Sequence, residues 1–137
     1  MIDDAFPDDR LYDASGQMWY QPLGDGTWRI GMTPLGRRMV GRVLAFMPRP
    51  EGRHIELDRA FATIESGKWV GAARLVFAAT ITATHDDLID QPEPINRDPL
   101  GDGWLVVVRP DDEAAARTIL VDSHGDFPAD IPDDVIQ

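Results

Sequence analysis

The sequence predicts a mainly β fold with two short helices, and three kinds of observation support this. Several short segments alternate apolar and polar residues with a period of two, as half-buried strands do. Turn-forming Gly-Asp-Gly runs stand at 24–26 and 101–103, each just before a strand-like segment that contains a tryptophan. Helix-capping residues stand at Thr33 and Asp112. About seven short strands in 137 residues indicate one small barrel or sandwich domain.

The first predicted hairpin surrounds Gly24-Asp25-Gly26, where glycine accepts the positive φ that tight hairpin turns require. Residues 17–21 form its first strand and residues 27–32 its second. In the second strand Trp28, Ile30 and Met32 are spaced two apart, so they face the same side of the sheet. This side is the expected core side.

A helix is expected next, with Thr33 as N-cap and Pro34 at the first helical position, running to Gly41. Val43 to Met47 then reads as a buried strand. The later elements are predicted as a polar loop over 49–58, strands over 60–64, 73–77 and 80–84, a mainly loop segment over 86–99, a strand over 104–109, and a C-terminal helix from the cap at Asp112 toward Leu120.

Charge and composition restrict the class of protein. The formal net charge of −11 disfavours binding to nucleic acid, because phosphate backbones would be repelled. The carboxylates gather at the two ends, so residues 1–10 and 121–137 are predicted to be acidic, flexible segments around a domain at 11–120. The start resembles no secretory signal, and no apolar run approaches the ~20 residues of a membrane helix. We therefore expect a cytoplasmic protein with no membrane contact.

The chain contains twelve arginines but one lysine, Lys68. A general arginine bias explains why lysine is rare. It does not explain why the one lysine lies in Glu65-Ser66-Gly67-Lys68-Trp69, a turn-like break between two predicted strands. A lysine amine, unlike a guanidinium, can lose its proton and become an attachment point.

Two familiar lysine chemistries fit this segment poorly. A phosphate-binding loop needs Gly at the position of Ala62 and Ser or Thr at the position of Trp69. A lysine that forms Schiff bases is usually desolvated in a pocket, whereas Lys68 is predicted on a turn with Glu65 nearby, which favours the ammonium form.

Catalysis by other side chains has little support. The chain has no cysteine, and it has no Gly-x-Ser-x-Gly segment of the kind that holds a nucleophilic serine. Its histidines, His54, His85 and His124, are far apart in the sequence. The pair His85-Asp86 resembles the His-Asp pair of metal phosphohydrolases, but the remaining ligands are missing. We expect no catalytic residue and no metal.

A lysine held at a β-turn suits a carrier arm. The amine must be exposed to reach a modifying enzyme, and the turn must be rigid so that its shape can be recognised. Gly67 gives the backbone freedom that a tight turn needs. Trp69 could pack under the turn or shield an attached group, and packing is the expected role.

Three segments resemble the glycine cleavage system H protein family. Glu65-Ser66-Gly67-Lys68 resembles its Glu-Ser-x-Lys lipoylation motif. The run from Pro92 to Trp104 resembles its Pro-Glu-x-x-Asn-x-Asp-Pro-x-Gly-x-Gly-Trp signature, at the family spacing from the lysine. The run from Gly26 to Thr33 resembles its Gly-Thr-x-x-x-Gly-[Ile/Met]-Thr segment. The resemblance spans about residues 11–112.

The resemblance implies a lipoyl-type barrel-sandwich hybrid with Lys68 on a hairpin tip. It implies that Lys68 carries lipoic acid in amide linkage, that Glu65 and Ser66 are recognised by the lipoylating enzyme, and that Gly67 shapes the turn. That enzyme would be a lipoate ligase or a lipoyl transferase. The other implied partners are the pyridoxal-phosphate glycine decarboxylase, the folate-dependent aminomethyltransferase and dihydrolipoyl dehydrogenase, between which the protein would carry an aminomethyl group.

The sequence departs from this family around the lysine. Common H proteins have Val before and Ala after it, where this chain has Gly67 and Trp69. The expected Pro-Val-Ser-Gly turn downstream is replaced by residues 76–79. The run Gly-Lys-Trp-Val-Gly is more similar to the H-like lipoate-binding proteins of bacterial sulfur oxidation, which implies a sulfur carrier that works with a heterodisulfide-reductase-like complex. An unmodified H-like interaction module is a further alternative.

Overall fold

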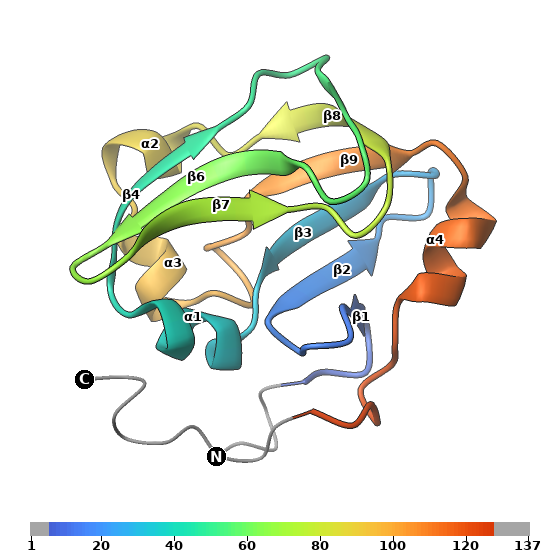
Figure 1. The fold of residues 1–137 in the computed structure, drawn as a ribbon, viewed down its shortest axis with the longest axis horizontal. Helices are drawn as coiled ribbons and strands as arrows, with labels where there is room; N and C mark the ends of the chain where they lie inside the picture. The colour runs from blue at the N-terminus through green and yellow to red at the C-terminus, as the bar shows by residue number, and fades with distance from the viewer. Residues whose placement is uncertain (1–5, 128–137) are drawn as a thin grey trace.

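The computed structural model describes residues 6–127, which fold into two antiparallel sheets and four short helices (Figure 1). The strands are β1 Leu11–Tyr12, β2 Met18–Pro22, β3 Trp28–Met32, β4 Val43–Pro48, β5 His54–Ile55, β6 Ala60–Ser66, β7 Val70–Arg74, β8 Ala79–Thr84 and β9 Val106–Pro110. The helices are α1 Pro34–Val40, α2 Asp87–Asp90, α3 Glu93–Arg97 and α4 Glu113–Ile119. None of these helices is long and apolar enough to cross a membrane.

The two sheets face each other across one core. The six-stranded sheet has the order β1-β2-β3-β9-β8-β5, and the three-stranded sheet has the order β4-β6-β7. Figure 1 shows β6 and β7 in front of β3 and β9, with the turn between β6 and β7 projecting at one end. Fully buried side chains of this core come from strands of both sheets: Tyr20, Trp28, Ile30, Phe46, Phe61, Ile81, Val106 and Val108. Leu75, Leu88, Ile95 and Leu105, from the connections and helices, are fully buried beside them.

The predicted mainly β class, the helix between early strands and the C-terminal helix are confirmed. Both predicted helix caps are formed. The Thr33 hydroxyl accepts a hydrogen bond from the amide of Gly36 at 3.0 Å, and the Asp112 carboxylate accepts one from the amide of Ala115 at 3.1 Å. Each cap satisfies an amide that has no partner within its helix, so local chemistry alone fixes where these helices begin.

Several predicted elements are wrong. Residues 86–99 are not mainly loop, since α2 and α3 lie there, each held by one buried side chain, Leu88 and Ile95. The strand predicted over 73–77 is formed only at its first two residues, because β7 ends at Arg74. Leu75 and Phe77 are buried in the connection between the two sheets. The strand predicted over 104–109 begins only at Val106, and the two-residue strands β1 and β5 were not predicted.

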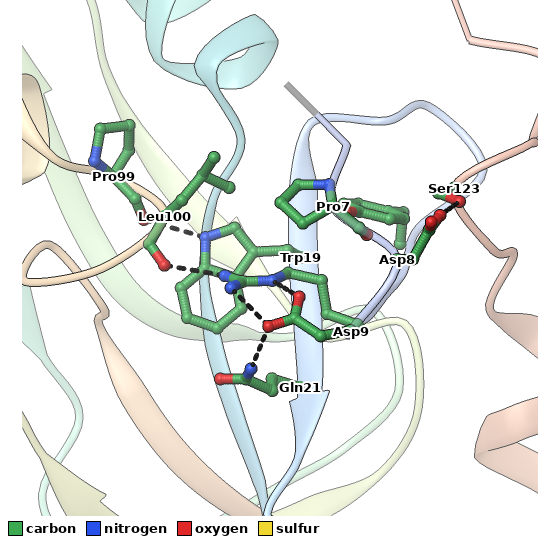
Figure 2. A network of polar contacts seen from close by, with 10 residues as sticks. Pro7, Asp8, Asp9, Trp19, Gln21, Pro99, Leu100 and Ser123 are labelled. Atoms are coloured by element: carbon green, nitrogen blue, oxygen red, sulfur yellow. Dashed lines mark hydrogen bonds and ion pairs between the residues drawn. The ribbon is translucent and has the colours of Figure 1, made fainter. Parts of the chain in front are cut away.

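Arg10 anchors the start of the described chain to β2 (Figure 2). Its guanidinium lies 4.6 Å from the centre of the Trp19 ring and donates hydrogen bonds to the Asp9 carboxylate and to the carbonyl of Leu100. The Trp19 indole in turn donates to the carbonyl of Pro99 at 2.9 Å. A cation desolvated on an aromatic face in this way contributes on the order of 1–2 kcal/mol.

The described parts of the two ends pack on each other. Phe6 stacks on Phe127 at 4.3 Å, and both rings contact Tyr12 edge-on. Val121 pairs with Tyr12 through backbone hydrogen bonds of 2.7 and 2.8 Å. The domain limits at 11 and 120 stay predictions. The remaining parts of the expected flexible ends, residues 1–5 and 128–137, lie outside the described residues.

Candidate functional site

Lys68 lies in the turn between β6 and β7, as the sequence predicted. The amide of Ser66 donates to the carbonyl of Trp69 at 2.7 Å, which closes the turn. The Ser66 hydroxyl accepts from the amide of Lys68 at 3.3 Å and donates to the carbonyl of Trp69 at 3.4 Å. Ser66 is buried at 5% exposure, whereas Glu65, Gly67 and Lys68 are exposed. The serine side chain therefore braces the turn from inside.

The turn presents Lys68 toward the end of α1. A Cβ added to Gly41, the residue after this helix, would lie 2.9 Å from Cε of Lys68, so the lysine stem passes directly over this glycine. Gly41 has φ +87°, a conformation that also favours glycine. A Cβ added to Gly67 would meet no other atom within 4 Å, so the tip itself is open to solvent.

The Trp69 ring packs along its own strand. A Cβ on Gly71 would lie 2.1 Å from Cζ2 of Trp69, so the indole occupies the space that any other side chain at position 71 would need. Residues two apart on a strand share a face, which brings the ring over the glycine. Trp69 stays 41% exposed. The Trp-x-Gly spacing was the sequence feature that could have revealed this contact.

Asn96, 28 positions after the lysine in the sequence, supports the strand beside the turn. Its side-chain oxygen accepts from the amide of Val43 at 2.8 Å, and its side-chain nitrogen donates to the carbonyl of Val43 at 2.9 Å. Val43 pairs with Ser66 across β4 and β6. Arg42 forms an ion pair of 2.7 Å with Glu93, which lies on α3 as Asn96 does. The signature from Pro92 onward therefore fixes the first residues of β4 and, through them, one side of the lysine turn.

The remainder of that signature folds a compact loop. The Asp98 carboxylate accepts from the amide of Asp102 at 3.0 Å and lies where a Cβ on Gly101 would stand. A Cβ on Gly103 would lie 2.6 Å from the carbonyl of Pro94. These residues have structural roles, which the match to the family signature did not reveal.

The histidines stay apart from this turn. His85 stacks on Trp104 at 4.1 Å and hydrogen-bonds the carbonyl of the same residue at 2.5 Å through Nδ1. His54 hydrogen-bonds the carboxylate of Asp111 at 2.8 Å, which raises the pKa of the imidazole. Within residues 6–127, no three His, Cys, Asp or Glu side chains are grouped as metal ligands. His85 and Asp86 therefore have no further ligand beside them among the described residues.

The fold and the turn together define a class: a small two-sheet β protein that displays a lysine on a braced hairpin tip. The family model for the glycine cleavage H-protein matches residues 10–126. The chain belongs to this family.

Individual relatives have the same family name. "Glycine cleavage system H protein 5" of Aquifex aeolicus (strain VF5) is 37% identical over 122 residues, which cover 86% of this chain and 82% of the relative. The glycine cleavage system H protein of Mycobacterium avium (strain 104) is 36% identical over 122 residues, covering 86% of this chain and 91% of the relative.

A solved structure agrees with the fold. The crystal structure of a glycine cleavage system H protein from Mycobacterium marinum matches with a TM-score of 0.69 and 27% identity, covering 77% of this chain and 87% of that chain. The predicted barrel-sandwich hybrid is thereby confirmed.

Proposed function

We propose that this protein is a lipoyl carrier with lipoic acid in amide linkage to Nζ of Lys68. The observation that carries the proposal is the position of the chain's one lysine at the tip of the β6–β7 hairpin, in a member of the glycine cleavage H-protein family. The tip fits an attached arm, because Lys68 is exposed and the space around Gly67 is open.

The role of the protein's own residues is to hold and present that group. The amide forms when Nζ, as the free amine, attacks an activated lipoate carboxyl and displaces its activating group. When bound, lipoate supplies reversible dithiol–disulfide chemistry, which the cysteine-free chain cannot supply itself. The three hydrogen bonds of the Ser66–Trp69 turn keep the backbone beneath the arm fixed while the arm itself moves.

The residues around Lys68 have different roles in the proposed function. Glu65 is exposed on the outer face, so we assign it to contact with the lipoylating enzyme. Ser66 is buried and hydrogen-bonded within the turn, so we assign it to the turn's shape. Trp69 supports the turn by covering Gly71.

The partners follow from this function. A lipoate ligase or lipoyl transferase would attach the group. The glycine decarboxylase, the aminomethyltransferase and dihydrolipoyl dehydrogenase would then act on the arm in turn, in the cytoplasm. The protein is a carrier and catalyses no step alone.

One feature favours a second cargo. The contact between Trp69 and Gly71 makes Gly-Lys-Trp-Val-Gly a structural unit, and this run is more similar to the H-like lipoate-binding proteins of sulfur oxidation than to common H proteins. In that alternative the arm carries sulfur for a heterodisulfide-reductase-like complex. A comparison of holo-protein turnover with purified glycine decarboxylase and with a heterodisulfide-reductase-like complex would separate the two.

Intact mass spectrometry tests the function itself. The protein is expressed with a lipoate–protein ligase and lipoate, beside Lys68→Arg, which keeps the charge but removes the amine. We expect a lipoyl increment on the unsubstituted protein and none on Lys68→Arg. An unsubstituted protein with no increment would leave the unmodified interaction module as the better account, and an increment on both proteins would refute Lys68 as the site.

A further inference from the structure

The outer face of the three-stranded sheet is apolar and begins at the lysine turn. The inner face carries Phe46 and Ile64, which are buried. The outer face carries Leu44, Met47 and Val70, which are 52%, 58% and 66% exposed. Figure 1 shows this sheet at the front, with no described helix or strand over it. Exposed apolar side chains gathered on one face mark an interaction surface.

Strand register joins this face to the lysine turn. Glu65 pairs with Ala45 on one side and with Val70 on the other, so these three residues form the last outward row before the turn. The next outward row contains Met47, paired with Thr63. Val70 is two residues from Lys68, so any enzyme that closes on the amine also approaches this row.

The segment of the chain that contains this sheet has a charge opposite to that of the whole molecule. Residues 42–74, which supply all three strands, carry six cationic side chains against four carboxylates, whereas the whole chain has a net charge of −11. This segment, which also contains the connection from β4 to β6 and β5 of the other sheet, is therefore net +2, and the remainder is net −13. The cations are Arg42, Arg49, Arg53, Arg59, Lys68 and Arg74, and the carboxylates are Glu51, Glu56, Asp58 and Glu65. An apolar centre with arginines at its margin is the composition of a protein-binding surface.

The size of this face matches one partner. Three strands about 4.8 Å apart and roughly 20 Å long make a face smaller than the ~800 Å² that a standard interface covers on each side. An enzyme whose footprint begins at the turn and extends along the strands therefore covers the whole outer face. It reaches the far margin, where the exposed Arg49 follows β4 and the exposed Arg59 precedes β6.

We propose that the enzyme that lipoylates Lys68 docks on this outer face. It places apolar side chains on Leu44, Met47 and Val70 and carboxylates opposite Arg49 and Arg59. The inference rests on the proposed lipoyl function. A second copy of the chain fits the face less well, because a symmetric contact would bring the exposed arginines at the margin of one copy near those of the other.

Lipoylation kinetics test the proposal. A bacterial lipoate–protein ligase, ATP and lipoate are used with the apo protein, and kcat/KM is measured by intact mass. We expect the Leu44→Ser/Met47→Ser double variant to lose about tenfold in kcat/KM, mainly through KM, as for the loss of central interface side chains. The matched control is Ile119→Ser on α4, which removes an apolar side chain of 46% exposure from outside this sheet and is expected to stay within about twofold. Circular dichroism melting confirms that each variant is folded.

Charge reversal gives a second measurement. Arg49→Glu/Arg59→Glu is expected to lower kcat/KM about fivefold at low ionic strength, with a smaller loss at high salt. Unchanged kinetics in both double variants, on a wild-type protein that is lipoylated at Lys68, would refute the docking face and leave the carrier function standing. A wild-type protein that accepts no lipoyl group would refute the function itself. A symmetric dimer in solution that buries Leu44 and Met47 would also overturn the assignment of this face to the enzyme.

Discussion

Replacing Asn96 with alanine tests whether the family signature supports the lysine turn from a distance. The substitution removes two hydrogen bonds, of 2.8 and 2.9 Å, that the side chain makes with the amide and carbonyl of Val43. Val43 is 1% exposed, so water cannot easily replace either partner. Each buried backbone group left without a partner costs about 1–3 kcal/mol. We expect the free energy of unfolding to fall by about 2–4 kcal/mol, since Asn96 itself is only half-buried.

Urea denaturation followed by circular dichroism measures this loss. A domain of this size is stable by about 5–15 kcal/mol, so Asn96→Ala should still fold at 25 °C, with a melting temperature lower by roughly 8–15 °C. Arg97→Ala, an exposed neighbour on the same helix, is the control and should change stability by less than about 0.5 kcal/mol. Asn96→Ala should also be lipoylated more slowly than the unsubstituted protein, because Val43 pairs with Ser66 beside the lysine. A loss of stability no larger than that of Arg97→Ala would refute the role given to Asn96.

Two further predictions concern the turn and the pH response. Gly71→Ala places a methyl group where the indole of Trp69 lies, so it should lower the free energy of unfolding by about 1–3 kcal/mol and change the near-ultraviolet circular dichroism. In a Trp69→Ala background the same substitution should lower it by under about 0.5 kcal/mol. Equal losses in both backgrounds would contradict the packing of Trp69 on Gly71. The hydrogen bond that His54 donates to the Asp111 carboxylate raises the pKa of His54. The pair therefore stabilises the fold below the usual histidine pKa of 6.5, and this contribution is lost as the pH rises through the folded-state pKa. An NMR titration should show a His54 pKa above 6.5 that falls in Asp111→Asn, and an unchanged value would show that the ion pair does not form in solution.

The elements that were predicted correctly are those determined by residues only a few positions apart in the sequence. The period-two alternation at Trp28, Ile30 and Met32 gave the correct strand, and capping by Thr33 and Asp112 gave the starts of α1 and α4. Each of these features depends on residues only a few positions apart, so the sequence alone contains the whole cause.

Tertiary contacts determine the parts that were missed. Helices α2 and α3 have few residues; α2 ends two residues before Pro92, and α3 follows Pro92 and contains Pro94. Burial of Leu88 and Ile95 stabilises them in place of local propensity. Leu75 and Phe77 resemble strand residues because they are buried, but they lie in the connection that carries the chain from one sheet to the other.

In the candidate site, too, the local part was predicted and the long-range contact was missed. The turn around Lys68 could be predicted because its motif is contiguous. The pairing of Asn96 with Val43 joins residues 53 positions apart, and nothing in either segment alone indicates it. The motif match found the correct residues near Asn96 without showing why they are there.

This pairing across 53 residues has a consequence for when the protein can be modified. During synthesis the β6–β7 hairpin leaves the ribosome well before Asn96 does, so the first residues of β4 lack their side-chain partner at that stage. Val43, the partner of Ser66 beside the lysine turn, gains its two hydrogen bonds with Asn96 only once α3 has docked. An enzyme that recognises the supported turn would therefore modify completed molecules faster than unfinished ones, so lipoylation would favour chains that have finished folding.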